Sequence, residues 1–383
     1  MYHLERIRYF LMFKKFSLKQ VDIWLMLLMF VLTGIGVLAI SSATASYGDE
    51  DLVKKQLIFF VVGLVMMLVV MSIDYHVLGD WYLVIYIFTL LVLVSVFFLG
   101  KDVNGATRWI QIGYFQFQPS EFAKISIILC GAKLIDKYNK KINRLWPIAI
   151  IGAFYFIPFI LINRQPNLST SIVVVMILVI QLFVTKLDFK YILSAVGIGL
   201  IVVTIAFVYI VKNPDQKLIA GYQRDRIVNK IHGGDSLNER FQTNQSIHAI
   251  GSGGLKGKGL YKGSISQLNY LPESQNDFII AVIGEEFGFI GASIVLALLL
   301  LFILRGLWIA RGAPDDFGKF IVIGYIGMIA MQSFVNIGVA TDLLPNTGIP
   351  VPFISYGGSS LWANMIGMGL VLNVAMTKEE TMF

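Results

Sequence analysis

Long apolar runs recur along the whole chain, and they constrain its fold more than any other feature of the sequence. Of the 383 residues, 56% are hydrophobic and only 14% are charged, which is about half the charged share of a typical soluble domain. A soluble globule of this length could not bury so much apolar surface, and disordered chains are poor in large apolar residues. The sequence therefore predicts an all-α polytopic membrane protein.

Ten of these runs approach the length of about 20 residues that a membrane-spanning helix needs, and none alternates as barrel strands do. The fourth run is the shortest, and a charged pair lies at its start. We predict one transmembrane domain over residues 1–383, with one large extracytoplasmic loop, 212–277, before the eighth span. The predicted spans are 21–40, 57–73, 81–99, 122–135, 146–162, 168–184, 191–211, 278–304, 317–340 and 356–376.

Lysine and arginine are distributed unevenly between the two sides of this arrangement. The termini and the loops on their side carry 16, the short loops on the opposite side carry six, and the 212–277 loop carries nine. Because short cytoplasmic loops carry the excess of basic residues, both termini are predicted to be cytoplasmic. The outward loop is net positive, and it suits an anionic lipid head group better than nucleic acid, which it would rarely meet there.

The glycine-rich stretch GSGGLKGKG, residues 251–259, does not fit either pattern of a nucleotide-binding loop. Gly259 follows Lys258 where a phosphate loop needs Ser or Thr, and Lys256 stands where a dinucleotide fingerprint needs Gly. We therefore interpret it as a flexible turn whose amides could approach a phosphate. The four histidines show no metal-ligand spacing, and Cys130 is interpreted as a small buried hydrophobic residue.

Carboxylates gather where the eighth span begins. Glu273 and Asp277 are four residues apart in LPESQNDF, so a helix there would place both on one face. A half-buried carboxylate suits a general base, although Asp277 alone could equally cap the helix. Glu285 and Glu286 point about 100° apart on a helix and cannot share one partner. For them a functional role and a structural ion pair are equally open.

The segment NGATRWIQIGYFQFQPSEFAK, residues 104–124, combines a turn, an aromatic patch and three charges. Glu121 and Lys124 have the i,i+3 spacing at which helical residues pair. Arg108 could snorkel to the membrane interface or bind a pyrophosphate with two hydrogen bonds. Further on, GIPVPFISYGGSS, residues 348–360, predicts a rigid turn before a helix that can pack closely.

Taken together, these motifs resemble the SEDS family (shape, elongation, division and sporulation), which includes RodA, FtsW and SpoVE. The resemblance covers nearly the whole chain, and the GIPVPFISYGG form is more similar to the RodA branch. It implies a peptidoglycan glycosyltransferase that polymerises lipid II on the outer face of the bacterial cytoplasmic membrane, in elongation or division, with a class B penicillin-binding protein. Its motifs are NGATRWIQIG with FQPSEFAK, NQSIHAIGSGGLKGKG, LPESQNDFIIAVIGEEFGFIG and LPNTGIPVPFISYGGSSL.

The resemblance also implies roles for individual residues. Asp277 matches the essential acid of the large loop, and it would deprotonate the 4-hydroxyl of the acceptor sugar. Arg108 and Lys124 would stabilise the departing polyprenyl pyrophosphate. Acidic residues would orient these cations or help to hold a divalent ion, Mg²⁺ or Mn²⁺. The implied substrate-binding residues are Arg108, Gln118, Glu121, Lys124 and Glu273.

One position departs from the family pattern, and two other functions stay open. Residues 165–170 read QPNLST where the family commonly reads QPDLGT, so Asn167 cannot supply a carboxylate. A lipid II flippase is the first alternative, although a transporter places its polar site near the bilayer midplane. A non-catalytic scaffold for the transpeptidase is the second, and it predicts that replacing Asp277 leaves function intact.

Overall fold

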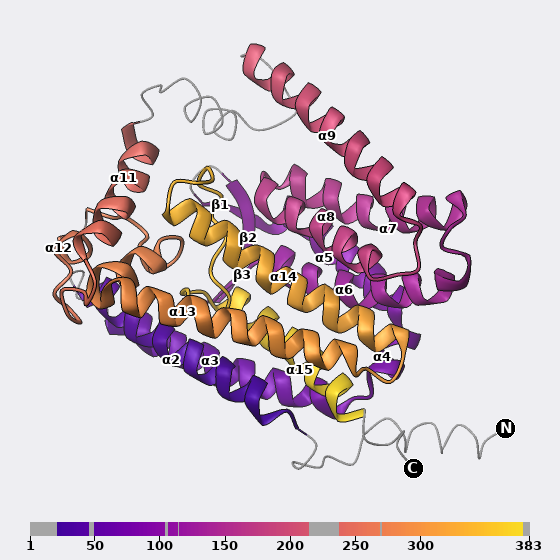
Figure 1. The fold of residues 1–383 in the computed structure, drawn as a ribbon, viewed down its shortest axis with the longest axis horizontal. Helices are drawn as coiled ribbons and strands as arrows, with labels where there is room; N and C mark the ends of the chain where they lie inside the picture. The colour runs from indigo at the N-terminus through magenta and orange to yellow at the C-terminus, as the bar shows by residue number, and fades with distance from the viewer. Residues whose placement is uncertain are drawn as a thin grey trace.

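The computed structural model describes residues 21–45, 50–103, 106–113, 115–213, 237–268 and 270–377. The two predicted cytoplasmic termini, residues 1–20 and 378–383, and residues 214–236 of the predicted loop lie outside the described residues. The described chain forms a bundle of long helices with one small sheet (Figure 1). Its elements are α2 (Ile23–Ala45), α3 (Glu50–Ser72), α4 (Tyr75–Asp80), α5 (Tyr82–Leu99), β1 (Gly100–Val103), β2 (Ala106–Ile112), β3 (Phe115–Phe117), α6 (Pro119–Tyr138), η2 (Asn139–Lys141), α7 (Leu145–Arg164), α8 (Leu168–Phe183), α9 (Phe189–Lys212), α11 (Leu237–Ser252), α12 (Ser264–Gln267), α13 (Ile279–Arg311), α14 (Asp316–Ala340) and α15 (Gly358–Thr377).

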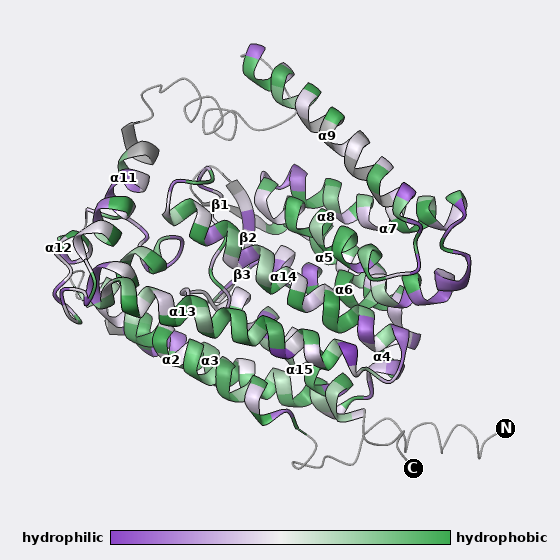
Figure 2. Ribbon diagram, in the orientation of Figure 1, coloured by the Kyte–Doolittle hydropathy of each residue, from purple (hydrophilic) through white to green (hydrophobic). Residues whose placement is uncertain are grey.

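The helices confirm the multi-pass membrane architecture. Seven of those in the described residues, α2, α3, α5, α7, α13, α14 and α15, are long and apolar enough to cross a membrane, and α8 is a shorter apolar helix. Hydrophobic residues dominate their lengths, and hydrophilic residues gather toward their ends (Figure 2). The predicted runs all coincide with helices, whereas the number of ten spans stays a prediction.

The most buried helices are α14, α15 and α6, which the other helices surround. Without a hydrophobic force between helices in lipid, close packing depends on small residues at the contacts. Gly369 of α15 illustrates this, because a Cβ there would lie 2.8 Å from the backbone oxygen of Met67 on α3. The two helices can therefore approach to backbone contact.

The glycine-rich segment, residues 251–259, packs against a break in α13. Gly288 has φ 67° and ψ −164°, which is not helical and which residues with a Cβ rarely adopt. The backbone groups freed at the break pair with the segment 251–259: Phe289 N donates to Gly254 O (2.8 Å), and Gly259 N donates to Glu286 O (2.9 Å). Residues 253–256 form the predicted turn, and these backbone hydrogen bonds hold it on α13, whereas its flexibility stays a prediction.

The two adjacent glutamates of α13 have different partners, as the 100° argument predicted. The Glu285 carboxylate is fully buried and accepts from Lys258 Nζ (2.7 Å) and from Ile265 N at the start of α12 (2.9 Å). Glu286 Oε1 instead accepts from Ser42 Oγ on α2 (2.5 Å). The structural ion pair is confirmed for Glu285, which holds Lys258 and the start of α12 on α13, whereas Glu286 joins α13 to α2 through Ser42.

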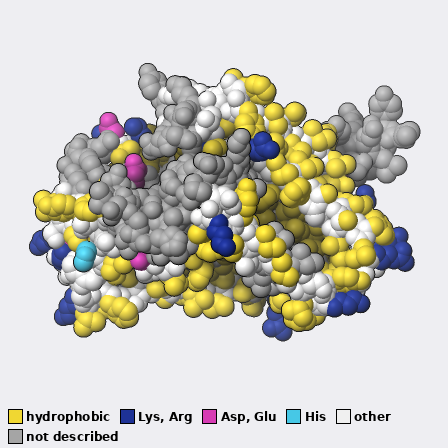
Figure 3. Space-filling model, turned by 90° about the horizontal axis from the view of Figure 1, so that it is seen from above, with side chains coloured by type: hydrophobic (Ala, Val, Ile, Leu, Met, Phe, Trp, Pro, Cys, Tyr) yellow, Lys and Arg dark blue, Asp and Glu magenta, His cyan; other side chains and the backbone are white. Residues whose placement is uncertain are grey.

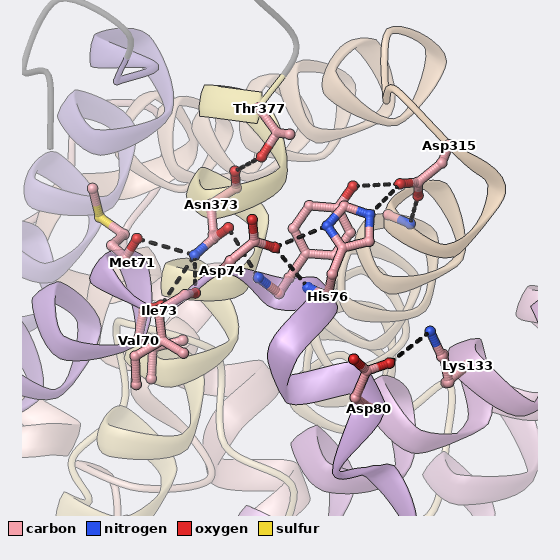
Figure 4. A network of polar contacts seen from close by, with 12 residues as sticks. Val70, Met71, Ile73, Asp74, His76, Asp80, Lys133, Asp315, Asn373 and Thr377 are labelled. Atoms are coloured by element: carbon pink, nitrogen blue, oxygen red, sulfur yellow. Dashed lines mark hydrogen bonds and ion pairs between the residues drawn. The ribbon is translucent and has the colours of Figure 1, made fainter. Parts of the chain in front are cut away.

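At the opposite end of the bundle, His76 of α4 lies between two carboxylates (Figure 4). Its Nδ1 is 2.8 Å from Asp74 Oδ1, and its Nε2 is 2.7 Å from Asp315 Oδ2. Hydrogen bonds to Asp315 and Asp74 raise the pKa of His76 to about 9, although burial opposes this. Burial raises the pKa of Asp315, but hydrogen bonds from His76, Gly318 and Tyr75 outweigh it and lower the value to about 2. The imidazolium therefore links α4 to the start of α14.

Candidate active site

A three-stranded antiparallel sheet connects α5 to α6 in order β1-β2-β3, where the sequence predicted only a turn and an aromatic patch. Arg108 and Trp109 are consecutive residues of β2. The sheet is fastened to α15, because Ser359 Oγ donates to Gln116 O (3.1 Å) and accepts from Gln118 N (3.0 Å). These bonds hold the sheet over the first turn of α6.

The first turns of α6 carry a buried ion pair. Pro119 stands at the start of the helix, where its missing N–H costs nothing. Lys124 Nζ donates to both carboxylate oxygens of Glu121 at 2.9 Å, and the two side chains are 1% and 6% exposed. This confirms the predicted i,i+3 pairing. A buried lysine held in this way is a fixed cation in a low-dielectric place, where it acts strongly on a nearby anion.

The start of α8 completes this side of the site. Asn167 is buried and caps the helix, with its Oδ1 accepting from Thr170 N (3.3 Å) and its Nδ2 donating to Ser120 Oγ (3.3 Å). Asn caps a helix as well as Asp does, so the departure from the family pattern keeps the cap and removes a charge. Beside it, Arg108 Nη2 donates to the backbone oxygen of Pro166.

These elements enclose a pocket together with α14 and the loop before α15. Its volume is about 80 Å³, which admits a few waters or one phosphate-sized group. Gln332 of α14 and the loop residues Gly348 to Pro350 form the facing wall. Of the six predicted site residues, the structure places four on the lining: Arg108, Gln118, Glu121 and Lys124.

Asp277 lies at the border of this pocket. Its side chain is half-buried, and its Oδ2 is 3.6 Å from the place that a Cβ would take on Gly348, a lining residue. Asn336 Nδ2 donates to the backbone oxygens of Asp277 and Ile349, each at 2.8 Å. One α14 side chain thus ties the predicted base to the pocket wall.

The prediction that Glu273 and Asp277 lie on one face of a helix is wrong. Residues 271–278 form turns, and α13 begins at Ile279 without a side-chain capping bond. Glu273 has φ 54°, is exposed, and accepts from Asn276 Nδ2 (2.6 Å). The tight turn sends the two carboxylates to different surroundings, and Glu273 does not line the pocket. Asp277 is not the helix cap either, because Phe278 occupies that position.

The pocket residues do not fit a divalent metal ion bound by the protein alone. Glu121 is the one carboxylate on the lining, and both its oxygens already accept from Lys124. No group of three or more His, Cys, Asp or Glu that could hold a metal occurs in the part of the chain that the structure describes. The positive charge facing a ligand therefore comes from Arg108 and Lys124.

Sequence reasoning missed Gln332 on the pocket wall. It lies within the apolar run of α14 and is 2% exposed, so neither a charge nor a motif marked it. The signal was available, because a polar residue inside a predicted span suggests a functional role.

The fold and the site define a class: a polytopic membrane protein whose cationic pocket lies at one end of its bundle, next to a half-buried aspartate. The family model for FtsW, RodA and SpoVE, described as cell cycle protein, matches residues 22–380. The chain belongs to this family, also called SEDS, and the resemblance in its motifs is confirmed.

Characterised relatives and solved structures match over nearly the full length. Stage V sporulation protein E of Bacillus subtilis is 38% identical over 365 residues, 92% of this chain and 96% of the relative. The peptidoglycan glycosyltransferase MrdB of Escherichia coli K12 is 36% identical over 356 residues, 93% of each chain. The RodA crystal structure from Thermus thermophilus has a TM-score of 0.69 at 26% identity, covering 93% of this chain and 96% of RodA. A chain of a peptidoglycan synthase complex has a TM-score of 0.79 at 28% identity, covering 94% and 98%.

Proposed function

We propose that this protein is a peptidoglycan glycosyltransferase that polymerises lipid II at the end of the bundle where the pocket lies. Its relative MrdB is named for that activity, and the chain matches it over 93% of both lengths. The observation that carries the proposal is the meeting of Arg108 and Lys124 in one pocket, with Asp277 at its border. Phosphate-binding cations beside a half-buried carboxylate provide both parts that glycosyl transfer from a pyrophosphate needs.

In the proposed reaction, the Asp277 carboxylate takes the proton from the 4-hydroxyl of the acceptor sugar. The hydroxyl oxygen attacks the anomeric carbon of the donor with inversion, and the bond to the polyprenyl pyrophosphate breaks. Arg108 and Lys124 neutralise the charge that develops on this leaving group, and Glu121 holds Lys124 in place. Asn336 fixes the backbone of Asp277, so the base needs no reorganisation during the reaction.

We propose that the pocket end faces outward from the bacterial cytoplasmic membrane and that the termini are cytoplasmic. The excess of basic residues on the terminal side supports this orientation. Hydrophobic side chains cover much of the face in Figure 3 and suit contact with lipid. We further propose a class B penicillin-binding protein as partner, supported by the similarity to a peptidoglycan synthase complex described as coordinating polymerisation and crosslinking.

The test is polymerisation of lipid II by the purified full-length protein with its partner, comparing wild type with Asp277→Asn. Asp51→Asn is the matched control, because Asp51 is an exposed acid at the start of α3. We expect glycan strands from wild type and from the control, and at least a hundredfold less from Asp277→Asn, the usual scale of a lost general base.

Equal polymer from Asp277→Asn and wild type would remove Asp277 from the mechanism. No polymer from wild type, where a known polymerase is active, would remove the glycosyltransferase proposal. Translocation of lipid II across vesicles would then support a flippase, and partner binding alone would support a scaffold. Omitting Mg²⁺ and Mn²⁺ and adding a chelator tests the divalent-ion prediction, which a tenfold or larger loss of activity would support.

A further inference from the structure

Two polar side chains of α14 lie on one face of the helix inside the apolar bundle. Gln332 and Asn336 are four residues apart and are 2% and 1% exposed. Their amide oxygens, Gln332 Oε1 and Asn336 Oδ1, accept no hydrogen bond from the described residues. Buried polar atoms without a partner are few in native proteins, so each such oxygen needs an explanation.

Asn336 has a structural explanation in the bonds of its amide nitrogen. Its Nδ2 donates to two backbone oxygens, of Asp277 and Ile349, and so joins two segments of the site. Its orientation is set by these donations, and the amide oxygen has to point away from them. Its open acceptor is therefore a consequence of a positioning role.

Gln332 differs because it lines the pocket, together with Arg108 and Lys124. A buried polar atom that has no protein partner, on a residue that lines a ligand cavity, has its natural partner in the ligand. The pocket already supplies two cations for a pyrophosphate, whose oxygens can only accept hydrogen bonds. The Gln332 amide oxygen is an acceptor too, so it needs a different part of the substrate.

We infer that Gln332 is a substrate-contacting residue whose amide oxygen accepts a hydrogen bond from a sugar hydroxyl or acetamido N–H next to the pyrophosphate. This inference rests on the proposed glycosyltransferase function. The hydrogen bond makes binding selective, because a site with a buried acceptor binds a ligand that lacks the matching donor group more weakly. The pocket volume of about 80 Å³ admits one group of about phosphate size, so the rest of the lipid-linked sugar lies outside it.

The experiment compares the affinities of the full-length protein in detergent for two probes, lipid II and undecaprenyl pyrophosphate, which lacks the sugar. The variants are Gln332→Met, which removes the amide, and Gln332→Glu, which keeps an acceptor oxygen. Ser333→Ala is the matched control, because Ser333 is the neighbouring buried residue on α14, its Oγ also lacks a partner in the described residues, and it does not line the pocket.

We expect Gln332→Met to weaken lipid II binding about fivefold to tenfold, the scale of one hydrogen bond, and to leave undecaprenyl pyrophosphate binding unchanged. Unchanged pyrophosphate binding also shows that the variant is folded. In Gln332→Glu the added charge affects both probes alike, so the ratio of the two affinities stays at the wild-type value. Ser333→Ala changes neither affinity.

Equal losses for both probes, or no loss for lipid II, in Gln332→Met would overturn the inference. The inference would also be overturned if the ratio of lipid II affinity to undecaprenyl pyrophosphate affinity fell as far in Gln332→Glu as in Gln332→Met. An acceptor oxygen would then not be the group that binds the sugar. Failure of the proposed function is a separate result. In that case wild type itself neither binds lipid II nor polymerises it, whereas failure of this inference leaves wild-type polymerisation intact.

Discussion

Replacing Lys124 by Met tests whether the pocket depends on its buried ion pair. Lys124 and Glu121 are 1% and 6% exposed, and the ammonium donates to both carboxylate oxygens at 2.9 Å. Removing one partner of a buried pair leaves the other charge uncompensated, which costs about 3–5 kcal/mol of unfolding free energy. We expect a loss of that size in denaturation experiments on the purified protein in detergent, together with loss of lipid II polymerisation.

The double variant Glu121→Gln with Lys124→Met separates stability from activity. Replacing both charges by neutral groups of similar volume is often neutral or stabilising, so most of the lost stability should return. Polymerisation should stay low, because the pocket still lacks one cation. Lys54→Met is the matched control, since the pair of Lys54 with Asp51 has the same i,i+3 spacing but is exposed. Its effect should stay within about 1 kcal/mol.

Two results would refute this reasoning. If Lys124→Met were as stable as wild type, the Glu121 carboxylate would not be a buried charge that depends on Lys124. If the double variant were as unstable as Lys124→Met, the lost stability would come from packing of the lysine side chain. The charges of the pair would then not contribute to the free energy of unfolding.

Two further predictions concern the helix ends and the break in α13. The raised pKa of His76 means that its contribution to stability is complete below pH 6.5, the ordinary value, and is lost as the pH rises through about 9. The melting temperature of wild type should fall over that interval, and an equally steep fall in His76→Gln would contradict the link with Asp315. Gly288→Ala should destabilise the protein by more than the about 1–3 kcal/mol of backbone strain, because the new Cβ would lie 2.3 Å from Gly257 N. Gly251→Ala, with no atom within 4 Å of the new Cβ, should cost nothing, and equal melting temperatures for the two variants would sink this explanation.

Local sequence rules predicted much of the fold and a part of the site. The apolar runs located the helices to within a few residues for most spans, since burial in lipid depends on composition over one continuous segment. The Glu121–Lys124 pair followed from a spacing of three residues on one helix. Where local rules failed, another segment intervened: the turn of 271–278 is held by the Asn336 bond to Asp277 from α14, and no local helix formed.

The class of protein, the helices and the residue types available for chemistry follow from the local sequence, because these depend on neighbours along the chain. The tertiary structure alone decided that Arg108 meets Pro166, 58 residues away, and that Asn336 meets Asp277, 59 residues away. It also decided that Gln332 faces the pocket and that Glu273 does not line it. A site assembled from the ends of several helices depends on how these helices pack, and that packing is the sum of many contacts between distant residues.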